Sequence, residues 1–134
     1  MSRKIAVIDD SPEILELLKI VLENEGYRVE LFLGPEIDLE ALKKSAFDLI
    51  MFDLLPGKDK QRHQFVYLVR QDPQLCATPL IWCTAWEALV KKIEDWMVEQ
   101  KVVIMLKPFE LNDLLDIIET ALGQKLEPGY KRQS

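Results

Sequence analysis

Apolar and polar residues alternate along this chain with two different periods. Three short runs, IAVI, LIMF and VVIML, are apolar without interruption, which is typical of parallel strands covered by helices on both faces. A fourth run, YRVELF, alternates apolar with polar positions and suits an edge strand with one wetter face. With one further apolar run, the predicted strands are Lys4–Asp9, Tyr27–Phe32, Phe47–Phe52, Leu80–Cys83 and Val102–Leu106.

Segments between and after these strands show helical spacing of their apolar residues. The first has clear boundary signals, because Ser11 is a candidate N-cap, Pro12 suits the first helical turn and Gly26 suits the position after the C-cap. One apolar stripe is expected on this helix, as for a helix that packs on a sheet, and it consists of Ile14, Leu15, Leu18, Val21 and Leu22. The predicted helices are Pro12–Glu25, Asp38–Ser45, His63–Gln71, Trp86–Gln100 and Glu110–Leu122.

The strict alternation of strands and helices predicts an α/β fold. Right-handed crossovers then give a parallel sheet with helices on both faces. Five units of this length favour a doubly wound, flavodoxin-like (βα)5 fold with five strands in the order 2-1-3-4-5. We predict one domain over residues 1–123, followed by a polar, aperiodic tail at 124–134 that is flexible.

Composition narrows the possible functions. The 134 residues suffice for one core, and 17 Lys plus Arg against 23 Asp plus Glu give a net charge of −6. This acidic balance argues against direct binding of nucleic acid and against a basic membrane-binding patch. No apolar run is long enough to cross a membrane and no signal peptide is recognisable, so a cytoplasmic protein is expected.

The cysteines and the histidine suggest no metal or redox site. Cys76 and Cys83 fit no such motif and are interpreted as small core residues in a reducing compartment. A single histidine, His63, nearly excludes a histidine-based zinc site or a catalytic triad, and it is placed in a polar loop with a solvated side chain. Trp82 and Trp96 are interpreted as core aromatics.

Candidate chemistry lies where the predicted strands end. Asp9 and Asp10 end the first strand, Asp53 the third, Thr84 the fourth and Lys107 the fifth. Because ligands of such sheets bind beyond the carboxyl ends of the strands, we expect these side chains to share one pocket. Three carboxylates, one hydroxyl and one ammonium would then meet there.

The adjacent carboxylates need a neutralising partner. Two carboxylates about 4 Å apart repel by roughly 4 kcal/mol at an effective dielectric constant near 20. An incompletely filled site made only of oxygen ligands suits Mg²⁺, so Asp9 and Asp10 are interpreted as a cation site. Asp53 remains as a nucleophile for a phosphoryl group, whose oxygens Lys107 and the Thr84 hydroxyl would contact.

Four motifs make the chain resemble the receiver domain of bacterial two-component response regulators. They are the acidic pair in VIDDS, Asp53 in LIMFDLLPG, the TA of CTAW, and KPF at Lys107–Phe109, and the resemblance covers roughly residues 3–122. It implies that Asp9, Asp10 and Asp53 bind Mg²⁺ and that a sensor histidine kinase phosphorylates Asp53. The family often has a cis peptide bond at the position of Lys107–Pro108, but the sequence does not decide which isomer this chain has.

The resemblance further implies a phosphorylation-controlled signalling module rather than an enzyme. Such a module would still catalyse its own phosphoryl transfer and its own autodephosphorylation, the latter slowly. Expected partners are a sensor histidine kinase or phosphotransfer protein and a downstream protein target. The protein would be a monomer or a phosphorylation-dependent dimer. No DNA-binding output domain is recognisable after Leu122.

Several departures from the family pattern keep an alternative open. The loop after Asp53 has two residues before Pro56 where the family usually has three, which affects the expected Mg²⁺ shell. Ile104 stands where an aromatic switch residue is common, and Trp86 is placed to limit access of water to a phosphoryl group. The alternative is a phosphorylation-independent, pseudo-receiver binding module. A flavin protein would need a phosphate loop after the first strand, and a phosphatase would need acids separated by one residue.

Overall fold

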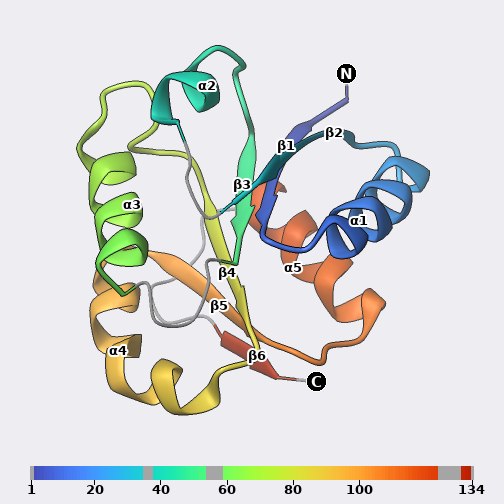
Figure 1. Ribbon diagram of the computed structural model, residues 1–134. Helices are drawn as coiled ribbons and strands as arrows, with labels where there is room; N and C mark the ends of the chain where they lie inside the picture. The colour runs from blue at the N-terminus through green and yellow to red at the C-terminus, as the bar shows by residue number, and fades with distance from the viewer. Residues whose placement is uncertain (1, 35–37, 54–58, 124–130, 134) are drawn as a thin grey trace.

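The computed structural model describes residues 2–34, 38–53, 59–123 and 131–133, with the side chains of 59–62 and 131–133 left aside. Within these ranges a parallel sheet lies between two layers of helices (Figure 1). The strands are β1 Lys4–Asp9, β2 Arg28–Leu33, β3 Leu49–Phe52, β4 Leu80–Thr84, β5 Val102–Leu106 and β6 Lys131–Gln133. The helices are α1 Pro12–Asn24, α2 Leu39–Lys43, α3 Asp59–Gln71, α4 Glu87–Glu99 and α5 Leu111–Gly123.

The order of the sheet is β2-β1-β3-β4-β5-β6, and every neighbouring pair is parallel. The predicted order 2-1-3-4-5 is therefore confirmed, with β2 at one edge. The short β6 pairs with β5, placing Arg132 opposite Met105, and the sequence analysis did not predict it. Three polar residues give no periodic signal, which explains the omission. Residues 124–130 lie outside the described residues, so the boundary at 123 and a flexible tail stay predictions.

The sheet separates two apolar cores. Residues of β3, β4 and β5 point alternately to opposite faces, because successive side chains of a strand do so. On the face covered by α1 and α5, buried residues include Leu22, Met51, Met105 and Ile117. The opposite core lies under α2, α3 and α4 and includes Leu42, Phe52, Val66, Trp82, Val90, Met97 and Ile104.

Element boundaries follow the predictions closely, with one larger difference. β1 and β5 have the predicted bounds, and most other ends shift by one or two residues. The predicted caps of α1 are present, since the Ser11 hydroxyl accepts from the Ile14 N–H at 3.3 Å and Gly26 has φ +93°. α3, however, begins at Asp59, four residues before the predicted His63. Its first turn, DKQR, is polar and therefore carries no apolar periodicity.

Two interpretations of single residues were wrong. Cys83 is buried in the core, whereas Cys76 is exposed in the connection before β4. His63 lies on α3 rather than in a loop, and its half-buried ring packs against Trp96, with 4.5 Å between the ring centroids. Trp82 is fully buried, as predicted, and Trp96 packs partly buried against the same core.

Candidate functional site

The carboxyl ends of neighbouring strands bring the predicted site residues together. The Asp53 N–H donates to the Ile8 carbonyl at 2.9 Å, which fixes the end of β3 beside β1. The Lys107 N–H donates to the Thr84 carbonyl at 2.7 Å, which fixes the end of β5 beside β4. The polar side chains therefore start from backbone positions held by the sheet itself.

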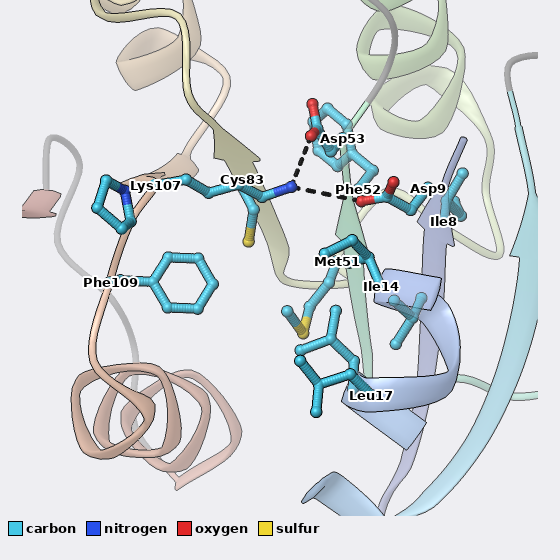
Figure 2. Close-up of a pocket in the computed structure, with 13 residues that line it drawn as sticks. Ile8, Asp9, Ile14, Leu17, Met51, Phe52, Asp53, Cys83, Lys107 and Phe109 are labelled. Atoms are coloured by element: carbon cyan, nitrogen blue, oxygen red, sulfur yellow. Dashed lines mark hydrogen bonds and ion pairs between the residues drawn. The ribbon is translucent and has the colours of Figure 1, made fainter. Parts of the chain in front are cut away.

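Lys107 connects two of the carboxylates. Its Nζ donates to Asp53 Oδ2 at 2.8 Å and lies 3.5 Å from Asp9 Oδ2 (Figure 2). The Lys107–Pro108 peptide bond, whose isomer the sequence left open, is cis. The predicted convergence of Asp9, Asp53 and Lys107 is thus what the structure shows.

Burial and charge set the protonation behaviour of this group. Burial is the main cause that raises the pKa of Asp9, which is 4% exposed, and the charge of Asp53 and a bond to Asp10 add to it. The Ser11 N–H at 3.0 Å and the Lys107 charge act in the opposite direction. For Lys107, burial disfavours the ammonium, but the bond to Asp53 and the charges of both carboxylates outweigh it and raise the pKa.

Thr84 and Asp10 lie around this contact. Thr84 is 5% exposed at the end of β4, and its Oγ1 accepts from the Trp86 N–H at 3.2 Å. Trp86 is the N-cap residue of α4 and is 40% exposed. Asp10 follows β1 and is exposed. The roles assigned to Thr84, Asp10 and Trp86 from the sequence stay predictions.

The carboxylate oxygens at this site suit Mg²⁺ chemically, but they are not arranged as a complete metal-binding site. Among the residues that the structure describes, no three carboxylate, imidazole or thiol side chains are grouped to hold a metal ion. Asp9, Asp10 and Asp53 offer only oxygen ligands, which suit Mg²⁺ with retained water. The shortened loop at residues 54–58, where we expected a change in the metal shell, lies outside the described residues.

An apolar cavity of about 320 Å³ lies beside the charged group. It extends between α1 and the segment after β5, with Leu17 and Phe109 on opposite sides (Figure 2). Cys83 also lines it, and burial raises the pKa of this thiol to about 12. This cavity was not predicted from the sequence. A usable signal was present, because Leu17, which lines the cavity, is an apolar residue off the predicted stripe of α1.

A family model for the response regulator receiver domain matches residues 5–119. The chain belongs to this family. Among curated relatives, the response regulator protein FleR of Pseudomonas aeruginosa is 32% identical over 92% of this chain and 26% of its own length. Transcriptional regulatory protein ResD of Bacillus subtilis is 30% identical over 95% of this chain and 51% of its length. This receiver domain therefore spans about a quarter to a half of these relatives.

Solved structures agree with the fold. Chemotaxis response regulator CheY4 of Vibrio cholerae has a TM-score of 0.75 at 28% identity, covering 91% of this chain and all of that one. The receiver domain of sensor histidine kinase PA1611 of Pseudomonas aeruginosa has a TM-score of 0.72 at 22% identity, covering 92% of this chain and all of that one. Its description reports a magnesium ion in its active-site cleft. At that identity, the likeness shows the fold alone.

This receiver domain is therefore a signalling domain of two-component systems. Within its described part, no helix has both the length and the apolar character needed to cross a membrane. The cytoplasmic location expected from the sequence stays a prediction.

Proposed function

We propose that this receiver domain accepts a phosphoryl group on Asp53, from a sensor histidine kinase or phosphotransfer protein, and passes the signal to a partner protein. The observation that carries the proposal is the Lys107 ammonium held 2.8 Å from Asp53 and 3.5 Å from Asp9 at the carboxyl edge of the sheet. A mobile point charge at a carboxylate nucleophile is suited to phosphoryl oxygens that arrive there.

In the transfer, an Asp53 carboxylate oxygen would attack phosphorus and the bond from phosphorus to the donor histidine nitrogen would break. The nitrogen keeps the electron pair of that bond, and the product is an acyl phosphate. Lys107 would move its hydrogen bond from the carboxylate to a phosphoryl oxygen, and the Thr84 hydroxyl would donate to another. Mg²⁺, held by Asp9, Asp10 and Asp53, would supply neutralisation of the phosphoryl charge.

The face beside the cavity supports a helical phosphodonor. Leu17 and Ile20 are exposed on α1, three residues apart and therefore on one side of the helix. Leu17 lines the cavity that Asp53 also borders, and exposed apolar side chains of this size favour a protein partner over bulk water. We infer that the donor helix covers α1 while its histidine approaches Asp53.

Intact mass after incubation with acetyl phosphate tests this function. We expect one phosphoryl adduct that requires Mg²⁺, is absent from Asp53→Ala and persists in Asp48→Ala. Asp48 is a matched carboxylate at the opposite end of β3, where its Oδ2 accepts from the Lys4 N–H at 2.8 Å. No adduct at any Mg²⁺ concentration, together with no Mg²⁺ binding in a titration, would contradict the proposal.

That negative result would favour the alternative, a phosphorylation-independent binding module. Two observations support the alternative: Ile104 is 1% exposed in the core where the family often has an aromatic switch, and the described carboxylates do not form a finished metal centre. A module of this kind would bind its partner equally well with and without acetyl phosphate.

A further inference from the structure

Two contacts join α3 to α4, and they start from positions on α3 that are two helical turns apart. The His63 ring packs on the Trp96 ring at 4.5 Å between centroids, with 40° between the ring planes. Arg70 lies seven residues after His63 on α3. Its Nε donates at 2.7 Å to the carbonyl of Gln100, the C-cap residue of α4. Seven residues are close to two full turns, so both side chains leave the same face of α3. The helices lie in one layer on their side of the sheet (Figure 1).

Arg70 fastens the C-terminal end of α4 more firmly than one bond would. Its NH1 donates to the Thr78 carbonyl at 2.8 Å and to the Cys76 carbonyl at 3.3 Å, and its NH2 donates to the Lys101 carbonyl at 3.4 Å. A planar guanidinium with donors in several directions fixes the relative positions of all these groups. Its positive charge also complements the negative end of the α4 dipole.

α3 in turn contacts the strand that carries the phosphoacceptor. Phe65 of α3 packs edge-on against Phe52, with 5.2 Å between ring centroids. Phe52 immediately precedes Asp53 and is 1% exposed. Because such interiors are close-packed, a shift at the end of β3 displaces its neighbour rather than being absorbed by empty space. Packed groups therefore connect Asp53 with α3, and through α3 with the C-terminal part of α4.

A side-chain rotation on β5 offers a poorer route. Ile104 is 1% exposed and pairs in register with Trp82, which is fully buried. Rotation of either side chain would have to displace its close-packed neighbours. In contrast, His63 and Trp96 are both half-buried at the surface of the helical layer, where a relative movement of the helices costs less burial.

We propose that α3 transmits the state of Asp53 to α4 through the His63–Trp96 contact and the Arg70 hydrogen bonds. The inference rests on the function proposed above and specifies how the signal leaves the site. The two helices shift together, and the altered position of α4 is what a partner would detect. The His63–Trp96 contact holds the last turn of α4, while Arg70 holds the C-cap residue Gln100 and Lys101 after it.

Hydrogen exchange of the full chain, followed by mass spectrometry with Mg²⁺ alone and with Mg²⁺ plus acetyl phosphate, tests the relay. Intact mass of the same samples reports the adduct. We expect phosphorylation to change exchange over residues 87–99, and His63→Ala to reduce that change by about threefold or more while the adduct still forms. Gln64→Ala, at an exposed neighbouring position of α3, is the matched control and keeps the full response.

A second variant addresses the other contact. Arg70→Lys keeps the charge but lacks the planar fork, so it should weaken the response at the C-terminal end of α4 more than at its N-terminal end. A thermal melt shows whether each variant folds, and His63→Leu replaces His63→Ala if the latter does not.

An adduct with an unchanged α4 response in both His63→Ala and Arg70→Lys would overturn the relay and leave the proposed function intact. The absence of any adduct, together with no Mg²⁺ binding, would overturn both, because the relay would have no signal to carry.

Discussion

The two ends of the sheet each hold one partly buried cation, and the two cations have different kinds of partner. At the carboxyl end, Lys107 lies between the carboxylates of Asp9 and Asp53. At the amino end of β4 and β5, Arg70 donates to four backbone carbonyls. Lys107 is a flexible point charge among partners that can change their charge, whereas Arg70 is a rigid fork among partners that cannot.

This difference separates a site of chemistry from a structural fastening. Charged partners in a partly buried site attract each other strongly, but they also respond to protons, metal ions and phosphoryl groups. The carbonyls that Arg70 binds are neutral. They therefore need a hydrogen-bond donor whatever the pH, the metal ion or the phosphoryl group at the other end. We therefore expect perturbations at the carboxyl end to have effects that depend on pH, and perturbations of Arg70 at the amino end to lower stability whatever the pH.

The two cysteines, one near each end of the sheet, should differ in the reactivity of their thiols. Cys83 lies beside Lys107, and burial raises its pKa to about 12, whereas Cys76 is exposed and offers its carbonyl to Arg70. At pH 8, Cys83 should react with a thiol reagent far more slowly than Cys76, since Cys83 is buried with a raised pKa and the thiolate is the reactive form. Timed labelling of Cys76→Ser and Cys83→Ala measures this. Equal rates in the folded protein would contradict the burial of Cys83, and in denaturant the two should converge.

Removing the amino-end cation should have a large effect on stability. Arg70→Ala removes the two shortest hydrogen bonds of this group, those to the Gln100 and Thr78 carbonyls. We therefore expect the free energy of unfolding to fall by about 2 kcal/mol. Urea denaturation measures the change. Arg28→Ala is the matched control, because Arg28 makes one 3.4 Å bond to the Ser2 carbonyl and should cost less than about 0.5 kcal/mol. Similar losses in both variants would show that the Arg70 hydrogen bonds contribute no more to stability than one long exposed bond does.

Neutralising a carboxylate at the opposite end should stabilise the fold. Burial raises the pKa of Asp9, so the folded state holds this proton more tightly than the unfolded state does. Stability is then lost as the pH rises through the interval between the unfolded and the folded pKa. Without Mg²⁺ at pH 7, Asp9→Asn should gain about 0.5–2 kcal/mol, the usual range for a stabilising substitution. Below the unfolded pKa the gain should disappear, and an equal gain at both pH values would refute the electrostatic explanation.

These differences also explain which features the sequence could predict. The strands, their order and the convergence of Asp9, Asp53 and Lys107 follow from apolar runs that end in polar residues, because the topology places all strand ends at one edge. The Arg70 bonds were not predictable in this way, since they depend on where loops such as that at Thr78 come to lie. His63 was misplaced because the polar first turn of α3 hid the start of the helix.

The smallest predicted effect is at the turn that Arg70 holds. Lys101 has φ 60°, a left-handed conformation that disfavours residues with a Cβ, and its N–H donates to the Val98 carbonyl at 2.9 Å. Lys101→Gly relieves that strain and retains both backbone groups, but it also makes the unfolded chain more flexible. We expect a net gain of about 0.5 kcal/mol in the free energy of unfolding, measured by urea denaturation beside Lys101→Ala, which keeps the Cβ and should change little. In an Arg70→Ala background the glycine should gain less, because a turn freed from the guanidinium can relax by itself. An undiminished gain there would mean that Arg70 does not hold the turn in its strained form.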